Sequence, residues 1–119
     1  MIVVSDTTPL NYLILIQRIE ILHSLYNEVV VPPAVVNEML APGTPAQVIE
    51  WTRNKPAWVI VTQAALTTSE IGADIEEAEA EAILLAEQLN ADLILLDDRR
   101  AREVAEGRGL RVVGTGYSH

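Results

Sequence analysis

The sequence predicts an α/β fold, a three-layer α/β/α sandwich around a mostly parallel sheet of about five strands. Short runs of β-branched and aliphatic residues alternate along the chain with longer segments in which apolar residues return at helical spacing. The short runs are apolar almost throughout, which is typical of parallel strands buried on both faces. With 119 residues, the chain is large enough for one core but too short for two, so we expect a single domain over residues 1–119.

The expected strands are residues 2–4, 29–31, 58–61, 93–96 and 110–113. Helical spacing runs over residues 10–25, with a change of helix near Arg18. Pro32 and Pro33 end the second strand and open a helix that runs to Leu40, because proline suits a helix start but not a helix interior. Further helices are expected at residues 45–53, 75–89 and 98–106.

Composition narrows the class of protein. The chain has 8 basic and 17 acidic residues, a net charge of −9, which argues against unaided nucleic-acid binding because phosphate contacts need Lys and Arg. It has no cysteine, which excludes disulfides and thiolate metal sites. No apolar run approaches the roughly 20 residues that span a bilayer, and the first run holds Asp6 and lacks a basic leader. We therefore expect a cytoplasmic protein without membrane contact.

The charged residues separate along the chain. Five of the eight basic residues lie in one C-terminal stretch: Arg99, Arg100, Arg102, Arg108 and Arg111. Six acids crowd the segment before it: Glu70, Asp74, Glu76, Glu77, Glu79 and Glu81. An acidic pocket beside an Arg-rich edge would suit a divalent cation next to a polyphosphate. Charge alone favours the plainer interpretation that both runs are solvated helix faces.

Two acids directly follow predicted strands. Asp6 comes after the first strand and Asp97 after the fourth, so both belong to the carboxyl edge of the sheet, where open α/β folds bind ligands. If these strands are neighbours, about 4.8 Å apart, the two carboxylates could share one cation. The alternative for each acid is to cap the helix that follows it.

Two glutamates add to this set. Glu79 falls in the apolar stripe of its helix, because alanine or isoleucine follows it at plus three, four and seven. A buried unpaired charge is costly, and a metal, a positive partner or a raised pKa would relieve that cost. Glu38 lies among apolar residues after the double proline, where it is by itself more typical of a boundary residue. Glu76 and Glu77 fit the first turn of a helix, where the helix dipole stabilises negatively charged side chains.

With these four acids located, the sequence resembles the PIN-domain nucleases, and more narrowly their DUF3368 branch, which is related to the VapC toxins. The likeness is carried by motifs that span nearly the whole chain, in the order Val4-Ser5-Asp6-Thr7-Thr8-Pro9-Leu10, residues 30–38, Glu79-Ala80-Glu81-Ala82-Ile83, residues 90–100 and Val112-Val113-Gly114-Thr115. Each motif alone is weak, but together and in this order they are specific.

The resemblance implies a metal-dependent endoribonuclease whose ligands are Asp6, Glu38, Glu79 and Asp97. These four carboxylates would hold one or two Mg²⁺ or Mn²⁺ ions, hard cations that take oxygen ligands. The chemistry would be in-line attack on an RNA phosphodiester by a metal-activated water.

The resemblance also implies residues and partners around this centre. Thr7 or Thr8 would orient a ligand or a metal-bound water. Asp98 would support the ligands in the same way or cap the next helix, and we expect the cap. Arg99 and Arg100 are candidates for substrate contacts. RNA would be the substrate and a cognate antitoxin the partner, which makes the chain the toxin of a toxin–antitoxin pair.

The sequence departs from the family pattern at two places. Ala78 stands where relatives have the first glycine of Gly-Glu-Ala-Glu-Ala, a change that is harmless in a helix. Relatives continue beyond Gly-Thr with further helices, whereas this chain ends at His119 and looks shortened at its C-terminus. A shortened tail would expose one face or edge of the sheet, so we expect a homodimer.

Other classes of protein fit less well. Phosphoryl-transfer enzymes of the haloacid-dehalogenase type require a second acid where this chain has Thr8. These enzymes and receiver domains both require a well-placed lysine, and the only lysine of this chain is Lys55, which precedes Pro56. A nucleotide-binding Rossmann domain would need a G-x-G-x-x-G motif after a strand. The serious alternative is a catalytically silent PIN-like module that acts through an antitoxin or by forming oligomers.

Overall fold

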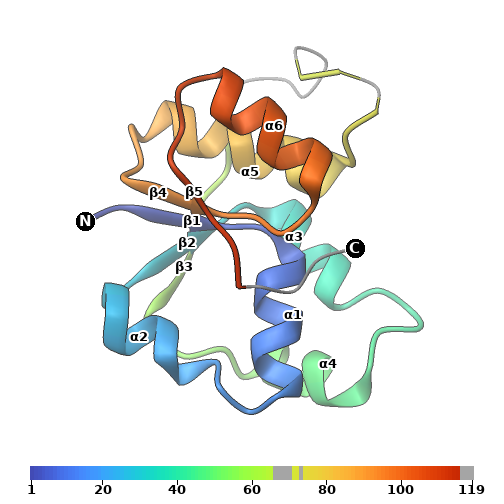
Figure 1. The fold of residues 1–119 in the computed structure, drawn as a ribbon. Helices are drawn as coiled ribbons and strands as arrows, with labels where there is room; N and C mark the ends of the chain where they lie inside the picture. Colours follow the sequence, from blue (N-terminus) through green and yellow to red (C-terminus); the bar gives the residue numbers. More distant parts are fainter. Residues whose placement is uncertain (66–70, 73, 116–119) are drawn as a thin grey trace.

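The computed structural model describes residues 1–65, 71–72 and 74–115. Its elements, in chain order, are β1 (Val3–Ser5), α1 (Thr7–Leu15), α2 (Glu20–Tyr26), β2 (Val29–Val31), α3 (Pro33–Met39), α4 (Ala46–Arg53), β3 (Val59–Val61), α5 (Glu77–Gln88), β4 (Leu93–Leu95), α6 (Arg99–Gly107) and β5 (Val112–Val113). The alternation of strands and helices is the predicted α/β fold (Figure 1). In these parts of the chain, no helix combines the length and the apolar character that crossing a membrane requires.

The strands form one parallel five-stranded sheet in the order β3-β2-β1-β4-β5. The chain builds outward from β1 to β3, then returns to the other side of β1 for β4 and β5. The switch point therefore lies between the carboxyl ends of β1 and β4, where such sheets bind ligands. The backbone N–H of Asp6 donates to the Leu95 carbonyl oxygen at 3.0 Å, so the two strand ends lie side by side, as sharing a site requires.

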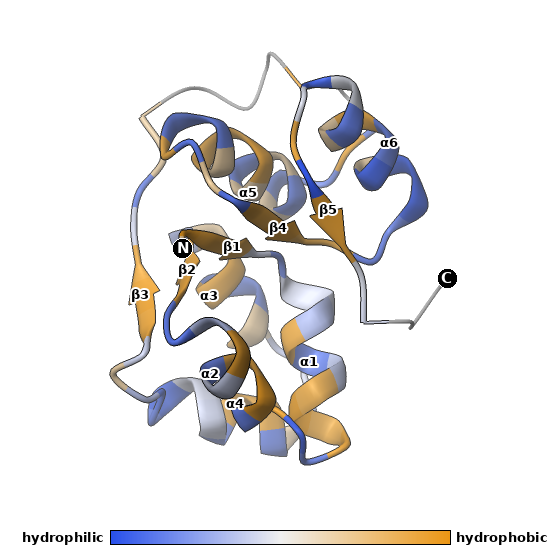
Figure 2. Ribbon diagram, turned by 60° about the vertical axis from the view of Figure 1, so that its left-hand side comes forward, coloured by the Kyte–Doolittle hydropathy of each residue, from blue (hydrophilic) through white to orange (hydrophobic). Residues whose placement is uncertain are grey.

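Helices cover both faces of the sheet, which confirms the three-layer sandwich. The pleat sends alternate strand residues to opposite faces. Val3 and Leu95 belong to a buried cluster with residues of α1, α2, α3 and α4. Val4 and Ile94 belong to a second cluster with residues of α5 and α6. Figure 1 shows α5 and α6 on one side of the sheet and α1, α2 and α4 on the other, and Figure 2 shows apolar strands between these layers.

The predicted element boundaries are close to the observed ones, with a few informative differences. Helix α1 begins at Thr7 rather than Leu10, because Pro9 then lies in the first turn, where its missing N–H costs no hydrogen bond. Asn90 follows α5 with a φ of 51°, the left-handed conformation in which many helices end. The fifth strand is shorter than predicted and begins at Val112. Glu70 lies outside the described residues.

Candidate metal centre at the rim of the sheet

Asp6 is buried at the carboxyl end of β1, where only 2% of its surface is exposed. It occupies the N-cap position of α1, but its side chain makes no capping hydrogen bond, so capping does not explain it. Its Oδ1 is buried without a hydrogen-bond partner among the described residues. Burial raises the pKa of Asp6 to about 8; the Thr7 backbone N–H opposes the rise, and the charges of Glu79, Glu38 and Glu76 add to it. A buried, unpartnered carboxylate oxygen needs a proton or a cation.

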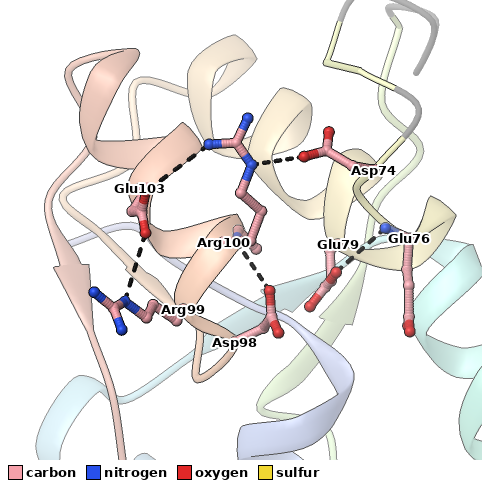
Figure 3. A network of polar contacts seen from close by, with 8 residues as sticks. Asp74, Glu76, Glu79, Asp98, Arg99, Arg100 and Glu103 are labelled. Carbon is pink, nitrogen blue, oxygen red and sulfur yellow. Dashed lines mark hydrogen bonds and ion pairs between the residues drawn. The ribbon is translucent and has the colours of Figure 1, made fainter. Parts of the chain in front are cut away.

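Glu79 is buried in the first turn of α5, as its place in the apolar stripe predicted. Its Oε1 accepts a hydrogen bond from the Glu76 backbone N–H at 3.3 Å, which helps to cap the helix (Figure 3). Burial raises the pKa of Glu79 to about 7, and the negative charge of Asp98 adds to the rise. Capping gives Glu79 an ordinary structural role, but it leaves the unfavourable electrostatics of the buried charge in place.

Glu38 lies near the end of α3 and reaches solvent, as a boundary residue would. Partial burial of its carboxyl still raises its pKa, and the charge of Glu76 adds to that rise. The Thr7 hydroxyl lies close enough to oppose this rise. The same hydroxyl oxygen is buried and makes no well-formed hydrogen bond in the described parts of the chain. Thr7 therefore suits the predicted role of orienting a ligand better than the half-buried Thr8 does.

Asp97 is also buried, with 3% of its surface exposed, but each of its carboxylate oxygens accepts a hydrogen bond. Its Oδ1 accepts a hydrogen bond from the Thr115 backbone N–H at 2.8 Å, and its Oδ2 accepts one from the Thr115 hydroxyl at 2.7 Å. Asp97 precedes the N-cap of α6 by one residue, so capping does not explain it either. The structure thus places Asp97 just past the end of β4, the strand next to β1, with its carboxylate held by the segment after β5.

Two further acids join this group. Asp98 Oδ2 accepts a hydrogen bond from the Ala101 backbone N–H at 3.0 Å, which confirms Asp98 as the N-cap of α6. Its charge is also a cause of the raised pKa of Glu79, and the two side chains lie near each other in Figure 3. Glu76, predicted only as a helix-dipole partner, adds to the pKa rise of Asp6, Glu38 and Glu79.

The two arginines predicted to contact substrate are exposed at the start of α6 and paired with acids. Arg100 Nε lies 2.7 Å from Asp74 Oδ2, and Arg100 Nη1 lies 3.8 Å from Glu103 Oε2 (Figure 3). Arg99 Nε lies 3.6 Å from Glu103 Oε1. Exposed ion pairs are weak and exchange readily with other partners, so these contacts leave both guanidinium groups able to meet an anion. Their substrate role stays a prediction.

The acids gather at one rim without closing on a single point. In residues 1–65, 71–72 and 74–115, no three His, Cys, Asp or Glu side chains lie close enough together to hold a metal ion. The donor set nevertheless fits a divalent cation, because carboxylate oxygens are the ligands that Mg²⁺ and Mn²⁺ prefer. Among the described residues, one buried oxygen of Asp6 lacks a hydrogen-bond partner. The pKa values of Asp6 and Glu79 are raised because their negative charges are unfavourable where they lie, and a bound cation would make those charges favourable.

A pocket of about 460 Å³ opens beside this group, between α3 and α5. Glu38, Glu77 and Glu81 line it together with Asn37 and Gln63. The lining includes Glu38 but not Asp6, so the pocket borders the candidate centre rather than covering it. Because the lining is acidic, we do not expect a phosphate backbone to enter this pocket.

The fold and its acidic rim define a class, the α/β proteins that gather carboxylates at the switch point of a parallel sheet. Several solved structures share the fold. A PilT N-terminus domain protein from the archaeon Sulfolobus solfataricus P2 is 21% identical, with a TM-score of 0.67 and coverage of 100% of this chain and 98% of that one. The PIN domain endonuclease Utp24 is 14% identical, with a TM-score of 0.71 and coverage of 98% and 86%. Curated proteins offer no match to this sequence.

The family follows from the sequence itself. The DUF3368 family, described as PIN domain, matches residues 2–117. The chain therefore belongs to this family of PIN domains, a group whose members are generally nucleases.

Sequence reasoning found most of this rim but missed two of its members. The structure brings Asp6, Glu38 and Glu79 within electrostatic reach of one another and sets Asp97 on the adjacent strand end. Thr115 was not predicted as part of the site, although extending the parallel pairing of the fourth and fifth strands places it opposite Asp97. Glu76 was predicted only as a helix-dipole partner, although its spacing of three from Glu79 is the mark of a capping box.

Proposed function

We propose that the chain is a Mg²⁺- or Mn²⁺-dependent endoribonuclease, acting in the cytoplasm as the toxin of a toxin–antitoxin pair. The observation that carries the proposal is the buried carboxylate of Asp6 at the switch point, with an unpartnered oxygen and a pKa raised to about 8. Near neutral pH, such a group is stable only with a proton or a cation beside it. Membership of a family of PIN domains supports phosphodiester hydrolysis as the reaction.

The proposed ligands are Asp6, Glu38, Glu79 and Asp97. When bound, the ion supplies a water nucleophile of lowered pKa and stabilises charge on the attacking and leaving oxygens of the phosphodiester.

The sheet and two local contacts would orient these ligands. Asp6 and Asp97 present their oxygens from neighbouring strands, which fixes their spacing by the sheet. The Glu76 N–H holds one oxygen of Glu79. The Thr7 hydroxyl lies beside Glu38, where it can orient that carboxylate.

The proposal is tested by cleavage of a labelled single-stranded RNA with EDTA, Mg²⁺ or Mn²⁺. We expect cleavage that requires the metal and disappears in Asp6→Asn. Asp92→Asn is the matched control, because Asp92 precedes β4 at the opposite end of that strand, where it accepts a hydrogen bond from the Ile2 N–H at 2.6 Å. Cleavage that persists in EDTA, or that both substitutions abolish equally, would contradict the proposal.

A specific observation favours a second candidate, the catalytically silent module. Within the described ranges no three acids converge on one point, as they would in a preformed metal site. This candidate predicts a folded protein that binds no Mn²⁺ and cleaves no RNA. A calorimetric Mn²⁺ titration of the wild-type protein separates the two functions.

We also propose that the chain acts with a protein partner, as a homodimer or with an antitoxin. Large apolar side chains are exposed on and after α1 and on α2, namely Leu15, Ile16, Ile21 and Leu25. Apolar surface of this kind is typical of protein interfaces. Sedimentation velocity over a range of protein concentrations tests the homodimer, and a single monomeric species at every concentration would contradict it.

A further inference from the structure

The C-terminal end of β5 is aligned with the metal-site end of β4. The parallel register pairs Ile94 with Val112 and Leu95 with Val113. The Leu96 N–H donates to the Val113 carbonyl oxygen at 3.0 Å, so pairing continues past the strand ends. Two residues further on, the same register sets Thr115 opposite Asp97.

Thr115 holds both oxygens of the Asp97 carboxylate. Its backbone N–H reaches Oδ1 at 2.8 Å and its hydroxyl reaches Oδ2 at 2.7 Å, while Asp97 itself is buried. Gly114 permits this close approach, because a Cβ there would lie 3.0 Å from Asp97 Oδ1 and 3.0 Å from an Arg102 nitrogen. The segment after β5 therefore fixes the orientation of the Asp97 carboxylate.

We propose that Thr115 is a positioning residue for the metal site: it holds Asp97 in the orientation that the metal needs and thereby couples the segment after β5 to metal binding. This inference rests on the proposed function. It assigns Thr115 a role that is exercised through Asp97, the residue that accepts both of these hydrogen bonds.

The Asp97 carboxylate can accept the two hydrogen bonds from Thr115 and bind a cation at the same time. An ionised carboxylate has about four lone-pair sites, and the two bonds from Thr115 use two of them. This leaves two lone-pair sites of the Asp97 carboxylate for a cation. Hydrogen bonds that fix a ligand's orientation remove the cost of ordering it during binding, and their loss typically weakens metal affinity by about 10–100-fold.

The test compares Thr115→Val with Thr115→Ser by calorimetric Mn²⁺ titration. Valine removes the hydroxyl bond to Oδ2 and keeps the backbone N–H, whereas serine keeps both. We expect Thr115→Val to weaken Mn²⁺ binding by about tenfold or more and Thr115→Ser to bind as the wild type does. In RNA cleavage, Thr115→Val should need more Mn²⁺ for its half-maximal rate, and saturating Mn²⁺ should restore the rate.

Thr52→Val is the matched structural control. Thr52 is buried, and its hydroxyl donates to the Val48 carbonyl oxygen at 2.7 Å within α4, so the substitution removes a comparable bond elsewhere. It should lower the free energy of unfolding without changing Mn²⁺ affinity. Gly114→Ala is a second variant that displaces Thr115 while keeping its hydroxyl, and it should weaken Mn²⁺ binding as well.

The outcomes separate the two proposals. If the wild type binds Mn²⁺ and Thr115→Val binds it equally well, losing only stability as Thr52→Val does, the positioning role is overturned and the nuclease proposal stands. If the wild type binds no Mn²⁺, the metal-dependent function itself fails. Weakened binding in Thr115→Val and Gly114→Ala, with unchanged binding in Thr115→Ser and Thr52→Val, supports the inference.

Discussion

Asp6 and Asp97 lie just past the ends of neighbouring strands and are both almost completely buried, yet their carboxylates differ in hydrogen bonding. Asp97 accepts two hydrogen bonds from Thr115, one on each oxygen. Asp6 has a buried oxygen without a partner in the described residues and lies among acids that raise its pKa to about 8. One carboxylate is stabilised by the fold, whereas the other destabilises the fold when it is charged.

This difference indicates that Asp6, and not Asp97, lowers the stability of the metal-free fold. A buried charge that is fully hydrogen-bonded is an ordinary structural solution. A buried charge without a partner is costly, and a cation would relieve that cost for several carboxylates at once. The contrast predicts that the same chemical change, Asp to Asn, will have opposite effects on stability at the two positions.

Asp6→Asn should give the largest effect. We expect RNA cleavage to fall by at least about 100-fold. Loss of a residue that only orients a metal ligand costs up to about 100-fold, and loss of a ligand itself should cost at least as much. In EDTA at pH 8, the same substitution should raise the free energy of unfolding by about 1–3 kcal/mol, because it removes a buried charge. Urea unfolding with and without Mn²⁺ measures this. A variant that is less stable than the wild type in EDTA would show that Asp6 is already satisfied in the metal-free protein.

Asp97→Asn should behave differently at the neighbouring position. Cleavage should fall by about tenfold or more, because the ligand is lost. The free energy of unfolding in EDTA should also fall, by about 1 kcal/mol, because the charged acceptor of the two Thr115 bonds becomes a neutral amide. The same unfolding experiment measures this. A gain in stability like that of Asp6→Asn would remove the contrast between the two acids.

The stability of the metal-free protein should fall as pH rises from 5 to 8. The carboxyls of Asp6 and Glu79 lose their protons near pH 4 in the unfolded chain but only near pH 8 and 7 in the folded one. Between these values the folded chain binds more protons than the unfolded chain, so raising the pH favours unfolding, by about 1.4 kcal/mol per pH unit for each extra proton.

Urea unfolding in EDTA at pH 5, 6, 7 and 8 measures this dependence. Asp6→Asn should flatten the profile, and saturating Mn²⁺ should raise stability most at pH 8, where metal and proton no longer compete. A profile that is flat, or that rises with pH in EDTA, would contradict the assignment of Asp6 and Glu79 as buried and unpaired.

The smallest effect is expected at Asp98, which belongs to the rim but caps α6. Asp98→Ala should lower the free energy of unfolding by about 1 kcal/mol through loss of the cap, whereas Asp98→Asn should keep it, because Asn caps a helix equally well. Thermal unfolding of the two variants measures this. Equal destabilisation by both substitutions would show that the charge of Asp98, rather than its cap, matters.

The sequence predicted the features that depend on local pattern. The five strands, the double-proline start of α3 and the burial of Glu79 follow from apolar periodicity and from what proline permits. The positions of Asp6 and Asp97 on one rim follow from the rule that parallel strands end at one edge. The order of the strands, which makes β1 and β4 neighbours, could only be assumed from sequence.

What the sequence did not predict depends on register and on side-chain direction. The bonds from Thr115 to Asp97 join residues 18 positions apart and depend on how β5 aligns with β4. Whether Asp6 caps α1 or faces the other acids depends on one side-chain torsion, which no local pattern reports. These two details decide the chemistry of the rim.

The central claim is that the carboxylates at this rim form a cation site, and anomalous diffraction from crystals grown with MnCl₂ tests it most directly. We predict a manganese peak in ligand contact with Asp6 Oδ1 and with at least one carboxylate of Glu38, Glu79 or Asp97, and no such peak in Asp6→Asn crystals. A wild-type crystal with manganese only at other surface acids, or with none, would contradict the claim.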